Sequence, residues 1–111
     1  MDDHEQKEII EKTKNWLISK TAIQCAFLYG SFARGKASSQ SDLDIGVLFD
    51  PPVGVEKLIE YAQELELVLS GRRVDLIDLS NAQGLILKEV ISSNSVLKMQ
   101  NLKYPGVHNL K

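Results

Sequence analysis

The stretch Leu28–Asp50, LYGSFARGKASSQSDLDIGVLFD, decides how this sequence is interpreted. One hydrophobic run ends at Gly30-Ser31, and a second begins directly around the carboxylates Asp42 and Asp44. Side chains alternate between the two faces of a strand, so both carboxylates are expected to point the same way. Two carboxylates a few ångströms apart repel each other by about 1 kcal/mol in water and by several times more near a protein surface. The pair therefore needs a compensating partner.

Helical and strand patterns alternate around this stretch. Apolar residues at helical spacing predict an amphipathic helix over Asp3–Lys20, and the short apolar run Cys25–Tyr29 predicts a buried strand. The segment SFARGK can form one helical turn, and the polar ASSQS that follows is typical of a loop. A second strand is expected over Leu43–Phe49, and Pro51-Pro52 stops it because proline cannot donate to a strand ladder.

The second half of the chain continues the alternation. Helical spacing extends from Val55 to about Ser70, where Gly71 suits the end of a helix. A third strand is predicted over Arg73–Leu79, and Ser80 or Asn81 can cap a last helix that carries Ala82, Leu85, Ile86 and Val90. The segment SVLKMQ fits a strand or a loop, and the tail 101–111 is expected to be poorly ordered. The fold class is α/β (α+β), a small mixed β-sheet flanked by helices in one domain over residues 1–100.

Composition narrows the class of protein. The net charge of −2 over 111 residues argues against strong nucleic-acid binding through a broad basic surface. The acidic start MDDHEQKE lacks the apolar segment of a signal peptide. The longest uncharged run, Thr21 to Ala33, is shorter than the roughly 20 residues that span a bilayer. With Cys25 as the only cysteine, no intrachain disulfide can form. We expect a soluble cytoplasmic protein without membrane contact.

A third carboxylate, Asp75, lies within the next predicted strand. If that strand pairs beside the second strand, Asp42, Asp44 and Asp75 converge. A simpler interpretation is that Asp42 caps the SSQS turn and that Asp44 is exposed at a strand end. Oxygen ligands without His or Cys suit Mg²⁺, which keeps positions open for phosphate oxygens. Two such ions can assist an in-line displacement at phosphorus. Gly30 and Ser31 would let the backbone and a hydroxyl approach a phosphate.

The segment Gly30–Ala37 also matches the spacing G-x-x-x-x-G-K of a P-loop. A P-loop needs Ser or Thr after the lysine to hold Mg²⁺, and Ala37 has no hydroxyl. That hypothesis also leaves Asp42 and Asp44 without a role. We therefore set the P-loop aside.

Taken together, these elements resemble the minimal nucleotidyltransferases of the DNA polymerase β nucleotidyltransferase superfamily. The shared pattern is G-S-x-x-R-G, then S-D-x-D before an apolar strand, then a carboxylate on a later strand. It corresponds here to Gly30-Ser31, Arg34-Gly35, Ser41-Asp42, Asp44 and Asp75. The resemblance covers the chain to about Met99, and implies the nucleotidyltransferase fold with ATP as substrate and Mg²⁺, as two ions, as cofactor. One departure is Asn94-Ser95, where a glycine is expected in the last helix-to-strand turn.

The resemblance also implies residue roles. Asp42 and Asp44 would bind both metal ions, and Asp75 would complete the catalytic metal site and help to deprotonate the acceptor hydroxyl. Gly30 and Ser31 would hold the β- and γ-phosphates. Ser41 and Arg34 belong to the implied nucleotide-binding set, although a salt bridge that orients the turn is an equal alternative for Arg34.

Many such small proteins resemble the antitoxin half of a toxin–antitoxin pair whose partner is a helical HEPN-type ribonuclease. The implied reaction is transfer of AMP from ATP to a tyrosine of that toxin. Two alternatives stay open: nucleotidyl transfer to a small molecule or an RNA end, and a binding module that neutralises its partner by contact alone. The sequence also leaves open whether the chain forms a homo-oligomer.

Overall fold

The computed structural model describes residues 1–80 and 95–99. The helix expected to carry Ala82 and Val90, and the tail 101–111, lie outside the described residues, so those two predictions stay predictions. The described part contains three helices and four strands in the order α1, β1, α2, β2, α3, β3, β4.

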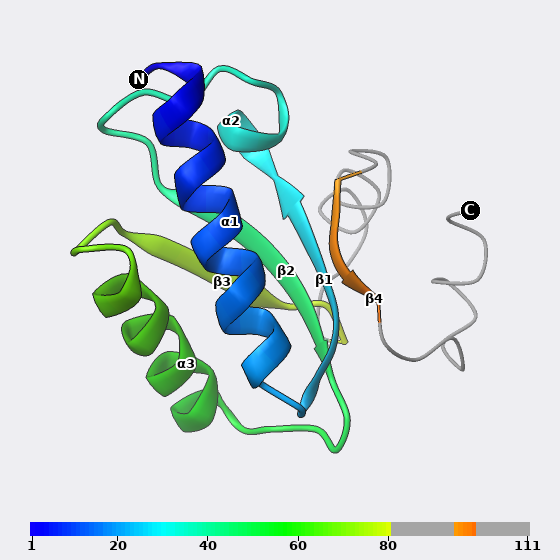
Figure 1. Ribbon diagram of the computed structural model, residues 1–111. Coiled ribbons are helices and arrows are strands. Elements are labelled where there is room, and N and C mark those ends of the chain that lie inside the picture. Colours follow the sequence, from blue (N-terminus) through cyan, green and yellow to red (C-terminus); the bar gives the residue numbers. More distant parts are fainter. Residues whose placement is uncertain (81–94, 100–111) are drawn as a thin grey trace.

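A four-stranded sheet with the order β3-β2-β1-β4 forms the centre of the fold (Figure 1). Its strands are β1 (Ile23–Tyr29), β2 (Leu43–Phe49), β3 (Val74–Asp78) and β4 (Val96–Met99). Strand β1 pairs antiparallel with both β2 and β4, whereas β2 and β3 run parallel. The predicted mixed sheet is therefore confirmed, and the ambiguous segment SVLKMQ contains a strand.

Two long helices cover one face of this sheet, α1 (Asp3–Ser19) and α3 (Val55–Val68) (Figure 1). The alternate residues of β2 explain why. Leu43, Ile45 and Val47 are fully buried in the main core that includes residues of both helices. Because side chains alternate along a strand, Asp44 projects from the opposite face. The same alternation that builds the core thus places this acid away from the helices.

The two helices are joined by a polar contact at their facing sides. The Trp16 indole N–H donates to Glu64 Oε1 at 2.8 Å, and Lys20 forms an ion pair with the same carboxylate. The hydrogen bond from Lys20, and then the one from Trp16, lower the pKa of Glu64. Tyr61 packs its ring edge-on against Trp16 and stacks on Phe49, which ties α3 to the sheet.

Helix α3 ends in a left-handed turn that leads into the sheet. Ser70 and Gly71 adopt left-handed φ values of 58° and 92°. The Gly71 N–H donates to the Glu66 carbonyl at 2.8 Å, and the Ser70 N–H donates to the Leu67 carbonyl at 3.2 Å. This is the Schellman pattern that ends helices. The chain then turns directly into β3, so Arg72 and Arg73 stand at the corner between α3 and the sheet.

The predicted boundaries need small corrections. Helix α1 ends at Ser19 with Lys20 as its C-cap, α3 ends at Val68, and β1 begins at Ile23. Lys98 of β4 donates to the carbonyls of Leu17 and Lys20 at 2.8 and 2.9 Å. A lysine from a distant strand thus provides hydrogen bonds to the carbonyls at the end of the first helix. Burial lowers the pKa of Lys98.

Candidate active site

The first half of the site is the junction of β1 with α2 (Gly30–Ala33). Gly30 has a φ of 72°, a conformation that favours glycine. A Cβ added to Gly30 would overlap the Asp44 carboxylate. The added atom would lie 3.1 Å from Asp44 Cγ and 3.4 Å from Asp44 Cβ. Glycine is therefore required twice, by the backbone and by the close approach of the acid. The predicted approach of a phosphate to Gly30 stays a prediction, because the group beside Gly30 in this structure is the Asp44 carboxylate.

The three acidic residues Asp42, Asp44 and Asp75 lie at one end of the sheet. Asp44 pairs in register with Asp75 on the parallel strand β3 and with Tyr29 on the antiparallel strand β1. Asp42 lies two residues before Asp44, directly before β2 begins. The backbone thus brings Asp42, Asp44 and Asp75 to the end of the sheet where Gly30 follows β1.

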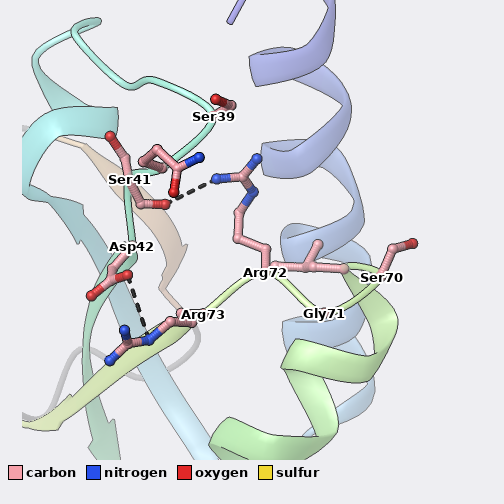
Figure 2. A pocket seen from close by; sticks show the side chains of 9 residues that line it. Ser39, Ser41, Asp42, Ser70, Gly71, Arg72 and Arg73 are labelled. Carbon is pink, nitrogen blue, oxygen red and sulfur yellow. Dashed lines mark hydrogen bonds and ion pairs between the residues drawn. The ribbon is translucent and has the colours of Figure 1, made fainter.

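The side chains at this edge are not arranged as a closed metal cage. Within residues 1–80 and 95–99, no three His, Cys, Asp or Glu side chains form a group that could hold a metal ion. One carboxylate has a cationic neighbour instead, because Asp42 Oδ1 lies 3.8 Å from Arg73 Nε (Figure 2). Asp42 and Asp75 are partly or fully accessible, so their carboxylates have room to turn.

The residues at this edge fit a hard divalent cation by their chemistry. All three candidate ligands are carboxylates, and Mg²⁺ prefers oxygen ligands from one or two carboxylates with the remaining positions open to water or phosphate. The absence of a side chain at Gly30 gives the Asp44 carboxylate the room it occupies beside the turn. Asp42, Asp44 and Asp75 would hold such an ion, which would stabilise charge on phosphate oxygens.

The remaining predicted residues surround these acids. Ser31 is half-buried, and its carbonyl accepts from the Lys36 N–H at 2.9 Å, which closes the turn after α2. Arg34 is exposed, and its N–H caps α2 through the Gly30 carbonyl at 3.2 Å. The Ser41 hydroxyl accepts from the Ser38 N–H at 2.9 Å. Ser41 thus stabilises the loop before Asp42, and the nucleotide contact implied for it stays a prediction.

Two residues that the sequence reasoning missed are Arg72 and Arg73. Both line a hollow of about 450 Å³ between the loop Ser39–Asp42 and the corner Leu69–Arg73 (Figure 2). Arg72 donates to the Ser41 carbonyl at 2.9 Å. The available signal was a pair of adjacent arginines at the start of the predicted strand Arg73–Leu79, in a chain of negative net charge.

Comparisons with known proteins agree with this geometry. The family described as polymerase beta, nucleotidyltransferase, matches residues 11–103. The protein adenylyltransferase MntA of Thermococcus cleftensis is 34% identical over 87 residues, which cover 78% of this chain and 87% of the relative.

Two solved structures share the fold. A toxin–antitoxin complex with AMP-PNP contains a chain that matches at a TM-score of 0.70 and 27% identity, over 83% of this chain and 74% of that one. A complex of a tri-AMPylated Shewanella oneidensis HEPN toxin with an MNT antitoxin contains a chain that matches at a TM-score of 0.65 and 26% identity. The match covers 86% of this chain and 73% of that one.

In the part of the chain that the structure describes, no helix has the length and apolarity needed to cross a membrane. The sheet order, the approach of Asp44 to Gly30 and the register of Asp44 with Asp75 all lie within the matched residues. The chain belongs to the polymerase beta nucleotidyltransferase family, and within it to the minimal nucleotidyltransferases of the protein adenylyltransferase type.

Proposed function

We propose that this chain transfers AMP from ATP, with Mg²⁺, to a tyrosine hydroxyl of a partner HEPN-type toxin, and so acts as its antitoxin. The observation that carries the proposal is the register of Asp44 with Asp75 directly beside the Gly30 turn. That arrangement supports the proposal, because two acidic residues lie next to the glycine turn that a phosphate would approach.

Each group has a role in this reaction. Asp42 and Asp44 would hold the divalent cations, which would offset the negative charge of the triphosphate and of the pyrophosphate that departs when the bond between the α-phosphorus and the bridging oxygen breaks. Asp75 faces the same edge from the neighbouring strand and is exposed, so an incoming hydroxyl can reach it. Its carboxylate accepts the proton of that hydroxyl as the new bond to the α-phosphorus forms. Gly30 and Ser31 contact the β- and γ-phosphates.

The relatives support a protein as the acceptor. The Thermococcus cleftensis relative is a protein adenylyltransferase, and the Shewanella oneidensis complex holds a HEPN toxin that carries three AMP groups. Tyrosine offers a hydroxyl on a rigid side chain that reaches into an open site.

The transfer also explains how a toxin would be neutralised. Each added AMP brings one negative charge and the bulk of a nucleotide. Near a site that binds RNA, the charge repels phosphates in the same way that other anionic modifications do. The modification alone would therefore weaken RNA binding after the two proteins separate.

The experiment uses the protein, the product of the neighbouring gene and ATP labelled at the α-phosphate, with and without Mg²⁺. Label on the protein partner, lost without Mg²⁺ and in Asp44→Asn, supports the proposal. Label on added RNA or on a small molecule would favour transfer to that acceptor instead. A toxin that is silenced without any label would favour neutralisation by contact alone.

A further inference from the structure

Arg72 contacts the segments that carry the site (Figure 2). Its Nη1 donates to the Ser41 carbonyl at 2.9 Å, directly before Asp42. Its guanidinium carbon lies 5.6 Å from the centre of the Phe32 ring in α2, the turn that begins with Gly30 and Ser31. Arg72 itself lies two residues before the first residue of β3, the strand of Asp75. One half-buried side chain therefore connects three elements that are distant in sequence.

We propose that Arg72 is a positioning residue for nucleotidyl transfer, which fixes the loop before Asp42 against α2 and the start of β3. The inference rests on the proposed function for its effect on nucleotide binding. Its structural part, that Arg72 holds the loop in place, stands without it.

Backbone hydrogen bonds on both sides of Arg72 hold its main chain in place. The Schellman turn precedes it, and the Arg72 N–H donates to the Leu69 carbonyl at 3.3 Å. On the other side, the Arg73 carbonyl accepts from the Leu43 N–H at 2.9 Å. The side chain thus extends from a rigid corner toward an exposed loop.

The loop before Asp42 is held together by local hydrogen bonds. The Ser41 N–H donates to the Ser38 carbonyl, and the Ser38 N–H donates to the Ser41 hydroxyl. Ser39 and Gln40 are exposed. The bond from Arg72 to the Ser41 carbonyl joins this loop to a segment 31 residues away. Without that bond, the loop would no longer be attached to the segment of Arg72. The hydrogen bonds between Ser38 and Ser41 inside the loop would remain.

Arginine suits the position better than lysine. A planar guanidinium can donate in its plane while its face lies over an aromatic ring, as Arg72 does with Ser41 and Phe32. A lysine ammonium can reach the carbonyl or the ring with less defined geometry. Arg72→Lys should therefore keep the charge and lose much of the positioning.

The next residue provides a matched control. Arg73 carries the same charge, but its side chain is 83% exposed and forms the long ion pair with Asp42. Arg73→Met removes a cation at the same edge without touching the Ser41 carbonyl. Because Arg73→Met also releases Asp42 from its ion pair, loop exchange is the reading in which a difference between Arg72→Met and Arg73→Met reports position and not net charge.

The test measures two quantities in the full chain: amide hydrogen exchange of residues 38–42 by NMR without nucleotide, and MgATP affinity by calorimetry. We expect Arg72→Met to speed exchange in the loop and to weaken MgATP binding about ten-fold or more, since small displacements of a binding group are costly. Arg72→Lys should lie between wild type and Arg72→Met. Arg73→Met should keep the loop protected and should not weaken MgATP binding.

Other outcomes would overturn the inference. Unchanged loop exchange in Arg72→Met, or equal changes in Arg72→Met and Arg73→Met, would show that Arg72 does not position the loop. If Arg72→Met does not fold, the same readings on Arg72→Lys decide the matter. Wild-type protein that binds no MgATP would refute the proposed function, while the exchange data would still judge the role of Arg72.

Discussion

Replacing Gly30 by alanine separates the two reasons for a glycine at that position. Gly30 and Gly35 both have left-handed φ values, 72° and 68°. Alanine in that conformation costs about 1–2 kcal/mol at either position. Only at Gly30 does the new Cβ meet another group, the Asp44 carboxylate, whereas at Gly35 it meets nothing within 4 Å. Gly35→Ala is therefore the matched control for backbone strain.

The steric conflict at Gly30 should affect function more than stability. The group in the way is the end of a short side chain, so Asp44 can rotate, and the extra loss of stability is small. We expect both variants to lose similar stability, with each kcal/mol lowering Tm by roughly 4–8 °C in a domain of this size. The rotated carboxylate is displaced from the phosphate turn, so Gly30→Ala should weaken MgATP binding by more than about ten-fold.

The assay combines thermal unfolding with calorimetry of MgATP binding for wild type, Gly30→Ala and Gly35→Ala. Gly35→Ala should bind MgATP with an affinity near that of the wild type. If Gly30→Ala bound MgATP as well as Gly35→Ala does, the contact between Gly30 and Asp44 would have no part in the site, and the reasoning would be refuted.

Three further predictions concern ion pairs and hydrogen bonds. Arg73→Met should tighten Mg²⁺ binding about two- to five-fold at low salt, because the ion no longer competes with a guanidinium for Asp42; titrations in high salt should erase the difference, and a persistent one would contradict this. Lys98→Met should lower the free energy of unfolding by about 1–3 kcal/mol in urea titrations, since two carbonyls at the end of α1 lose a charged donor; an unchanged midpoint would count against it. The hydrogen bond from Lys20 lowers the pKa of Glu64, so this carboxylate stabilises the fold above its ordinary pKa and loses that contribution as the pH falls through the lowered value. Glu64→Gln should therefore be less stable than wild type at neutral pH, by less than about 1 kcal/mol because the group is half-exposed, and the two melting temperatures should converge in acid.

Much of the fold could be predicted because it depends on local periodicity. The hydrophobic run that begins beside Asp42 and stops before Pro51-Pro52 predicted β2, and the structure confirms its bounds as Leu43–Phe49. Gly71 does belong to the turn that ends α3, as expected. The helix ends at Val68 and not at Ser70, because Ser70 also adopts a left-handed conformation. Helix ends depend on hydrogen bonds such as those from Lys98, which come from distant segments.

The candidate site divides in the same way. The sequence predicts four of the site residues because they stand in one short stretch with a characteristic spacing. These residues are Gly30, Ser31, Asp42 and Asp44. The pairing of Asp44 with Asp75 required only that β3 lie beside β2, which the structure shows. Arg72 could not be found by spacing, since its partner Ser41 lies 31 residues away and the contact is made to a backbone carbonyl.

The most direct test of the central claim is the intact mass of the partner protein after incubation with this chain, ATP and Mg²⁺. We predict that the partner gains mass in whole AMP units on tyrosine, and that Asp44→Asn, although folded, adds none. A partner whose mass stays constant while its ribonuclease activity disappears would contradict the claim.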